Sequence, residues 1–260
     1  MRRLRLGMMA GGISLDPDAQ AFLNAAGITD ATITTAIDTL VIQLKAIGVW
    51  TKMKAIYPFV GGTATTHKFN LKNPADTNAA FRLVFSGGWT HSANGIQGNG
   101  ANAYADTFIT PLANLLQNSN SFGIYSRTEI NGLFFDMGTF QSPWTSMACR
   151  LSDLFYCANN DNTYNEVANT SSLGFLISSR TAVNVKKGYR NNIQIQSVSQ
   201  FSTGLANGNI WIGALNSFGA GLYSIREYAF SFIGDGLNNT EAANFYTAVQ
   251  AFQTTLSRQV

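Results

Sequence analysis

The sequence predicts an all-β fold, an antiparallel sandwich with helices near the two ends of the chain. Only 12% of its 260 residues are charged, about half the usual share, whereas Asn and Gly are abundant at 25 and 24 residues. A helical bundle would need far more Glu, Lys and Arg. Beyond Val49 the apolar residues fall in short runs separated by turn-forming residues, which is typical of many short strands.

Two short helices are expected before the strands. Asp16 and Pro17 suit an N-cap and a first helical position, and Gly27 suits a left-handed C-terminal cap. A second helix should begin at Thr29 or Asp30. Its apolar residues form one stripe at helical spacing, which packs on the following domain or on a partner subunit, the domain being favoured: Ile33, Ile37, Leu40, Leu44 and Ile47.

The strands are expected between about residues 81 and 235. Asn131-Gly132 lies between two apolar, aromatic runs and predicts a hairpin, because both residues tolerate positive φ. Ser152-Asp153 indicates a second hairpin. The candidate strands cover residues 81–85, 121–130, 133–138, 147–151, 154–158, 174–179, 182–186, 193–198, 209–215 and 222–233.

The last strand leads into a closing helix. Tyr228, Phe230 and Phe232 alternate along that strand and should line one of its faces. Asn239 or Thr240 can cap the helix that follows. Its apolar residues share one face, which must be buried: Ala242, Phe245, Val249, Phe252 and Leu256.

The net charge of +3 has a single source. Arg2, Arg3 and Arg5 supply it, because the other 14 Lys and Arg residues balance 14 Asp and Glu residues. We interpret residues 1–15 as a flexible basic arm that docks onto a neighbouring protein, residues 16–48 as a helical pair, and residues 49–260 as the sandwich with its closing helix. The neutral body argues against nucleic-acid binding, and no apolar run suits a membrane span.

Four pieces of the second half occur in an informative order. They are a glycine- and asparagine-rich segment with Tyr104 (95–107), a strand with its turn (121–132), a turn (187–192), and a strand ending in Ile212-Gly213 before the last strand and helix. This order resembles laminin-G-like, concanavalin-A-like jelly rolls over about residues 81–258. The resemblance implies a concanavalin/laminin-G-like antiparallel β-sandwich with a small N-terminal helical pair and a C-terminal helix.

The first half resembles a different group. Its matching segments are residues 18–29, 50–62, 66–71 and 80–91. Together they look like a recurrent module, over roughly residues 16–110, in virion proteins of tailed phages infecting Bacteroidota, crAss-like phages included. The resemblance implies a phage structural protein in a tail, fibre or capsid-attached position. Such a protein is made in the host cytoplasm, resides in the virion, and has other virion proteins and its own copies as partners.

Catalytic motifs are missing from the sequence. Glycoside hydrolysis needs two carboxylates beside the scissile bond, and on a strand these occur two residues apart. None of the four glutamates, Glu129, Glu166, Glu227 and Glu241, has an acidic residue at that spacing. We therefore expect no enzyme. Distant carboxylates such as Glu227 and Asp136 could still converge in the fold. A glycoside hydrolase therefore stays open as the least favoured hypothesis.

Metal and thiol chemistry have little support. His67, His91, Cys149 and Cys157 lack any short zinc-ligand spacing. The two cysteines form one bridge or remain buried thiols, and thiols are favoured. We expect no cofactor other than a calcium ion, which laminin-G-like domains often bind.

A calcium ion would have Asp106 and Asp161 as its candidate ligands. Both offer hard carboxylate oxygens, and Asp161 lies within the polar run 159–162. The same run is also simply a loop of turn-forming residues. Both interpretations stay open at this point.

Aromatic residues in polar, loop-like settings are the remaining candidates for function. Sugar rings stack on aromatic faces while amides bind the hydroxyls, so Trp89, His91, Tyr104 and Tyr164 form a hypothetical glycan site. Trp211 lies in a strand and should belong to the core. The sequence thus favours a non-enzymatic virion structural protein that mediates subunit contacts. A lectin-like module for host adhesion through a cell-surface glycan is the alternative.

Overall fold

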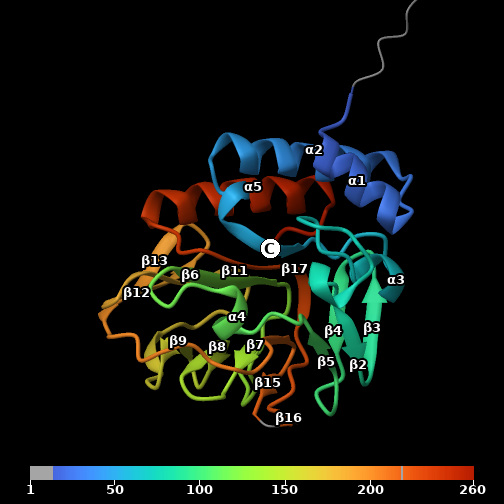
Figure 1. Ribbon diagram of the computed structural model, residues 1–260. Coiled ribbons are helices and arrows are strands. Elements are labelled where there is room, and N and C mark those ends of the chain that lie inside the picture. Colours follow the sequence, from blue (N-terminus) through green and yellow to red (C-terminus); the bar gives the residue numbers. More distant parts are fainter. Residues whose placement is uncertain (1–13, 218) are drawn as a thin grey trace, which may run out of the picture.

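The computed structural model describes residues 14–217 and 219–260, and it has three layers. An eight-stranded sheet, here called sheet I, lies between a layer of helices and a nine-stranded sheet, sheet II (Figure 1). The predicted antiparallel β-sandwich is confirmed. Arg2, Arg3 and Arg5 of the predicted arm lie outside the described residues.

The helices follow the local sequence signals. α1 (Pro17–Ala26) has Asp16 as its N-cap and Gly27 in the left-handed conformation, as predicted. α2 (Ala31–Ala46) begins after the N-cap Asp30, whose carboxylate accepts from the Ile33 amide. α5 (Asn239–Thr255) has a capping box in which Asn238, one residue before the predicted cap, and Glu241 bind each other's backbone amides.

Sheet I has the strand order β13-β12-β11-β6-β17-β4-β3, and β1 also pairs with β17. Every pairing in it is antiparallel. Its strands are β1 (Met53–Tyr57), β3 (Trp89–Ser92), β4 (Gly95–Gly98), β6 (Asn120–Ser126), β11 (Gly174–Ala182), β12 (Val185–Arg190), β13 (Ile193–Ser199) and β17 (Glu227–Gly234).

Sheet II has the order β10-β9-β8-β7-β14-β5-β2, with β15 and β16 beside β7. One parallel bridge, between Asn216 and Thr139, joins β15 to β7. Its strands are β2 (Val84–Ser86), β5 (Tyr104–Asp106), β7 (Met137–Thr139), β8 (Trp144–Leu151), β9 (Leu154–Asp161), β10 (Asn165–Ala168), β14 (Trp211–Ile212), β15 (Leu215–Asn216) and β16 (Ala220–Gly221).

Short helical turns connect the strands. They are η1 (Trp50–Lys52), α3 (Ala64–His67), η2 (Asn78–Ala80) and α4 (Pro111–Asn114). α4 lies in the region where only strands were expected. Pro111 at its first position explains the turn, because proline has the backbone φ of a helix start and no amide to leave unpaired.

The buried apolar residues of the described chain form three clusters. The largest packs α1, α2 and α5 on sheet I, so the helical stripes cover the chain's own sandwich, as favoured from the sequence. The second lies between the sheets and contains the free thiols of Cys149 and Cys157. The third, on the outer face of sheet II, has only three buried members, Phe135, Ala148 and Leu215.

The two predicted hairpins differ in outcome. Ser152 and Asp153 join β8 to β9 with φ values of 53° and 60°, so this hairpin is confirmed. The prediction of a hairpin at Asn131-Gly132 is wrong, because β6 belongs to sheet I and β7 to sheet II. Distant partners hold the crossing segment instead: the Ser172 hydroxyl and the Arg226 guanidinium both donate to the Ile130 carbonyl.

The last strand also departs from simple alternation. The register of β17 against β6 shifts between Tyr228 and Phe230. This bulge places Tyr228 in the core between the sheets, whereas Phe230 and Phe232 face the helices. The three side chains therefore do not share one face, contrary to the prediction.

Candidate functional site

Trp89 and His91 lie on β3 at the edge of sheet I rather than in a loop, which corrects the sequence interpretation. The indole Nε1 of Trp89 donates to the Tyr104 carbonyl at 3.2 Å. Its ring contacts Phe85 edge-on at a centroid distance of 5.6 Å. These contacts anchor the indole against the core between the sheets.

The two histidines bind each other. The Nδ1 atoms of His67 and His91 are 3.0 Å apart, and the Gly62 amide donates to Nε2 of His67 at 3.2 Å. Neutral His67 therefore carries its proton on Nδ1 and donates it to His91. Burial, then the neighbouring His91 and Arg258, lower the pKa of His67 to about 3. Burial also lowers the pKa of His91.

Tyr104 forms an aromatic pair on the outer face of sheet II. Its ring stacks on Trp211 with centroids 4.0 Å apart and an interplanar angle of 21°. Trp211 was expected in the core but is only half-buried, because its neighbour Ile212 takes the inward position on β14. The pair is a small, half-buried aromatic platform.

Tyr164 belongs to a separate and larger site on the same face, here called the aromatic pocket. The pocket has a volume of about 340 Å³. It lies between the third apolar cluster and the β15–β16 hairpin. Its lining residues are Phe135, Phe140, Tyr164, Leu215, Ser217, Gly221 and Leu222.

Three nearly parallel rings stack together here, and two of them, Phe140 and Tyr164, line the pocket. Phe140 and Trp144 have centroids 4.5 Å apart at 21°, and Trp144 and Tyr164 have centroids 5.0 Å apart at 25°. Phe140 and Tyr164 lie within 5° of parallel. All three side chains are half-buried, so part of each remains open to solvent. Flat aromatic faces of this kind can stack against the C–H face of a sugar ring.

Hydrogen bonds fix the walls of the pocket. The Phe135 amide donates to the Leu222 carbonyl at 3.0 Å, and the Phe140 amide donates to the Asn216 carbonyl at 2.8 Å. The hydroxyls of Tyr164 and Ser146 lie 2.9 Å apart. Gly138, with a φ of 140°, lets β7 approach β8 closely, because a Cβ there would lie 2.3 Å from Cα of Ser146.

The predicted glycan residues are thus not one site. Tyr164 joins the aromatic pocket and Tyr104 the second platform, while Trp89 and His91 lie on sheet I. The sequence interpretation missed Phe135, Phe140 and Leu222, which it placed in or beside ordinary strands. Their local sequence does not indicate whether a helix packs on the sheet face that carries them.

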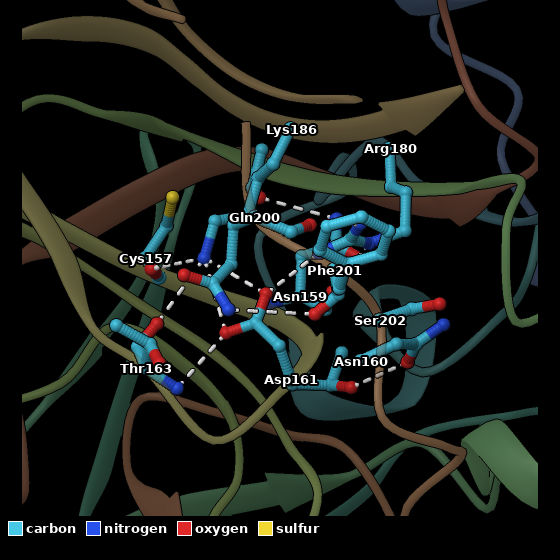
Figure 2. Close-up of polar contacts among 12 residues, drawn as sticks. Cys157, Asn159, Asn160, Asp161, Thr163, Arg180, Lys186, Gln200, Phe201 and Ser202 are labelled. Carbon is cyan, nitrogen blue, oxygen red and sulfur yellow. Dashed lines mark hydrogen bonds and ion pairs between the residues drawn. The ribbon is translucent and has the colours of Figure 1, made fainter. Parts of the chain in front are cut away.

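Asp161 is not an exposed turn residue. It is fully buried, and its carboxylate contacts Nη2 of Arg180 at 2.7 Å and Nζ of Lys186 at 2.9 Å (Figure 2). Arg180 also donates to the carbonyls of Asn159, Val183 and Gln200. Two cationic side chains already neutralise this carboxylate, so it serves as their counter-ion and not as an open calcium ligand.

Asp106 has protein partners as well. Its oxygens accept from Nδ2 of Asn209 at 3.0 and 3.1 Å, and from the Phe108 amide at 2.8 Å. In the part of the chain that the structure describes, no three His, Cys, Asp or Glu residues are grouped to hold a metal ion. Nor is any helix of that part long and apolar enough to cross a membrane.

Glu227 and Asp136 do not form a hydrolytic pair. Asp136 is fully buried, where it accepts from Arg226 at 2.7 Å, from the Tyr228 hydroxyl at 2.6 Å and from the Cys149 amide. Glu227 instead pairs with Arg127 at 2.6 Å. A buried, fully hydrogen-bonded carboxylate offers no place for a substrate or an attacking water.

Comparisons with known proteins show the fold alone. No protein-family model and no curated protein matches the chain. Among solved structures, a Trypanosoma rangeli sialidase is similar over 84% of this chain and 40% of its own, with 8% identity and a TM-score of 0.56. Botulinum neurotoxin type C, which interacts with two ganglioside molecules, is similar over 79% of this chain and 53% of its own, with 10% identity and a TM-score of 0.53.

A third similar structure is domain 4 of an extracellular arabinanase from Geobacillus stearothermophilus, solved with arabinotriose. It covers 75% of this chain and 98% of its own, with 13% identity and a TM-score of 0.46. The chain thus spans about half or less of the sialidase and toxin chains that it matches. This kind of β-fold occurs both in a hydrolase and in a ganglioside-interacting toxin.

Proposed function

We propose that this protein is a non-enzymatic, lectin-like component of a phage virion, and that the aromatic pocket binds a cell-surface glycan. One observation carries the proposal: Phe140 and Tyr164, whose rings lie within 5° of parallel, line a pocket on the sheet face that no described helix covers, and Trp144 stacks on both rings. Large aromatic faces left partly in water on a well-ordered strand face are typical of ligand sites.

The rigidity of the site supports binding. Main-chain hydrogen bonds join Phe135 to Leu222 and Phe140 to Asn216, and Trp144 stacks on both Phe140 and Tyr164, so backbone and rings support one another without a ligand. A preformed site loses little conformational entropy on binding. Each site still offers only a few contacts, so several copies on one particle would raise the avidity through effective concentration.

The arrangement of the carboxylates supports a binding role over catalysis. Glu129, Glu227 and Glu241 each pair with a cation, and Asp136 and Asp161 are buried in ion pairs. The similar β-fold of a ganglioside-interacting toxin agrees with this role. For the virion setting, the support is the resemblance of residues 16–110 to phage virion proteins.

A glycan array probed with an oligomeric form of the protein tests the binding role. We expect binding that Trp144→Ala and Tyr164→Ala abolish. Leu133→Ala is the matched control, because Leu133 is 72% exposed and does not line the pocket. Silence across the array, or binding that both ring variants retain, would refute glycan binding at this site.

The virion setting is tested separately. Antibody labelling of purified phage particles, viewed by electron microscopy, should mark one position on the particle. The same labelling shows whether that position is tail, fibre or capsid. Particles without label, from cells that express the protein, would remove the virion assignment and leave the binding role to be judged on the array.

Contacts between copies of this chain are a second candidate function. Leu112, Leu116 and Phe201 are 55%, 59% and 61% exposed. Their loops are tied together, since Leu112 donates to the Ala206 carbonyl and Ser202 donates to Asn118. A paired Leu116→Ser, Phe201→Ser variant should sediment as a smaller species than the wild type. An unchanged sedimentation coefficient would reject this interface.

A further inference from the structure

We propose that the aromatic pocket selects neutral saccharides that carry an apolar substituent, a deoxy-sugar methyl or an acetyl methyl group, over their fully hydroxylated counterparts. This inference rests on the proposed glycan-binding function and adds the chemical class of the ligand. It follows from which groups line the pocket and from how little hydrogen-bonding capacity its walls retain.

The lining is apolar on every described side. Its apolar lining residues are Phe135, Phe140, Tyr164, Leu215 and Leu222. Ser217 supplies the one described side-chain hydroxyl besides that of Tyr164. A sugar hydroxyl that enters such a pocket loses its water and gains few partners.

Several main-chain groups of the walls are already hydrogen-bonded to one another. The Leu222 carbonyl accepts from Phe135, and the Asn216 carbonyl accepts from Phe140. The Ser217 amide donates to the Gly219 carbonyl. A ligand hydroxyl that is buried here would therefore find few partners, whereas a methyl group would need none.

The hydroxyl of Tyr164 is bound within the fold and is not free for a ligand. It lies 2.9 Å from the Ser146 hydroxyl, and Ser146 is fully buried. Burial raises the pKa of Tyr164, which agrees with poorly hydrated surroundings. Ring and hydroxyl thus have separate roles, since the ring faces the pocket and the hydroxyl is bound to the sheet.

The charge of the lining residues limits the class of saccharide further. No Asp, Glu, Lys or Arg lines the pocket in the described part of the chain. A carboxylate or phosphate on the ligand would lose hydration there without a cationic partner. Acidic sugars should therefore bind more weakly than neutral ones that carry the same apolar substituent.

The size of the pocket limits what enters it. A volume of about 340 Å³ is at the small end for ligand pockets. It fits one monosaccharide with its substituent, and the rest of a longer glycan must lie outside. We expect the substituent to contact Leu222 while the sugar ring lies against Phe140 and Tyr164, the two nearly parallel rings that line the pocket.

Matched sugar pairs test the inference on the unmodified protein. Calorimetric or fluorescence titrations compare L-fucose with L-galactose, L-rhamnose with L-mannose, and N-acetylglucosamine with glucose, all as methyl glycosides. At least one pair should show a preference of about 10- to 100-fold for the methyl-bearing member, the discrimination expected of one apolar group in a complementary pocket.

Leu222→Asn is the companion variant, because Leu222 is 39% exposed and the change supplies a hydrogen-bonding wall group. It should reduce the preference at least several-fold, whereas Leu133→Asn should not. Equal affinity within every pair, or an undiminished preference in a folded Leu222→Asn protein, overturns the apolar-substituent inference while glycan binding stands. Failure of every sugar, on the titrations and on the array, refutes the proposed function itself.

Discussion

The two outer faces of the sandwich carry similar aromatic side chains but bury them to different extents. On sheet I, aromatic residues from β11 and β17 lie under α5, and Phe245 contacts Phe175, Phe230 and Phe232 edge-on. On sheet II, the short β15–β16 hairpin lies beside the aromatic residues around Tyr164, and no helix of the described residues packs on them. Figure 1 shows α1, α2 and α5 on the side of the molecule opposite β15 and β16. The same chemistry is core on one face and half-open surface on the other.

This difference separates stability from recognition. Rings on sheet I remove their whole surface from water within the chain, so they contribute to folding. Rings on sheet II keep part of their surface exposed, and no described residue buries that part. Changes on the two faces should therefore have opposite profiles in folding and binding experiments.

Asp161→Asn should have the largest effect, because the ion pairs of Asp161 join the two sheets. Asp161 is on β9 of sheet II, and its partners Arg180 and Lys186 are on β11 and β12 of sheet I. Asp161→Asn would leave two buried cations without a counter-ion. We expect the free energy of unfolding, measured by urea denaturation, to fall by an amount toward the upper end of about 3–5 kcal/mol. A loss below 1 kcal/mol would show that the cluster does not hold the sheets together.

Phe245→Ala tests the covered face alone. Its ring is fully buried, so the change should cost toward the lower end of about 3–5 kcal/mol, because α5 can shift and partly fill the cavity. Phe140→Ala is the matched change on sheet II and should cost less than about 1.5 kcal/mol, since its ring is half-exposed. Equal losses, measured by denaturant midpoints, would contradict the distinction between the faces.

The parts of the fold that the sequence predicted well are those with local causes. Asp16, Gly27 and Asp30 act on backbone groups within a few residues, so their caps could be read directly. The Asn131-Gly132 hairpin could not be judged in this way. Its neighbours prefer partners more than 40 residues away, namely Ser172 and Arg226, and such pairing leaves no local pattern.

The candidate site was predictable only in part for the same reason. Tyr164 was found because polar residues flank it, which marks a solvated position. Phe135 and Phe140 lie in an apolar run, and such a run looks identical whether a helix covers the strand or not. Asp161 was misread because its polar neighbours suggest a turn, while the two cations that bury it come from other strands.

Acid should weaken the edge of sheet I before it affects the aromatic pocket. The pKa of His67 is lowered to about 3 in the fold, against about 6.5 in the unfolded chain. The unfolded state then binds more protons, so this contribution is complete above pH 6.5 and is lost as pH falls toward 3. The loss should reach about 2 kcal/mol at pH 5.

Denaturant midpoints at pH 7 and pH 5 measure this loss, and His67→Gln should flatten the difference. Hydrogen exchange at pH 5 should accelerate in β3 and β4 more than in β7 and β8, because His91 lies on β3. Equal acceleration in the four strands would place the acid-sensitive group elsewhere.

Tyr164→Phe should have the smallest effect on stability, because it removes a single oxygen atom. Tyr164→Phe removes the hydroxyl that lies 2.9 Å from the Ser146 hydroxyl but keeps the ring that stands 5.0 Å from Trp144. The lost hydrogen bond should cost about 1 kcal/mol of stability, because Ser146 is left buried and unpaired. Saccharide affinity should stay within about twofold of wild type, since stacking uses the ring face and not the hydroxyl. Tyr164→Ala, which removes both, should abolish binding. If Tyr164→Phe weakens binding as much as Tyr164→Ala does, the hydroxyl is the group that contacts the ligand, and the open aromatic face of sheet II is not what recognises it.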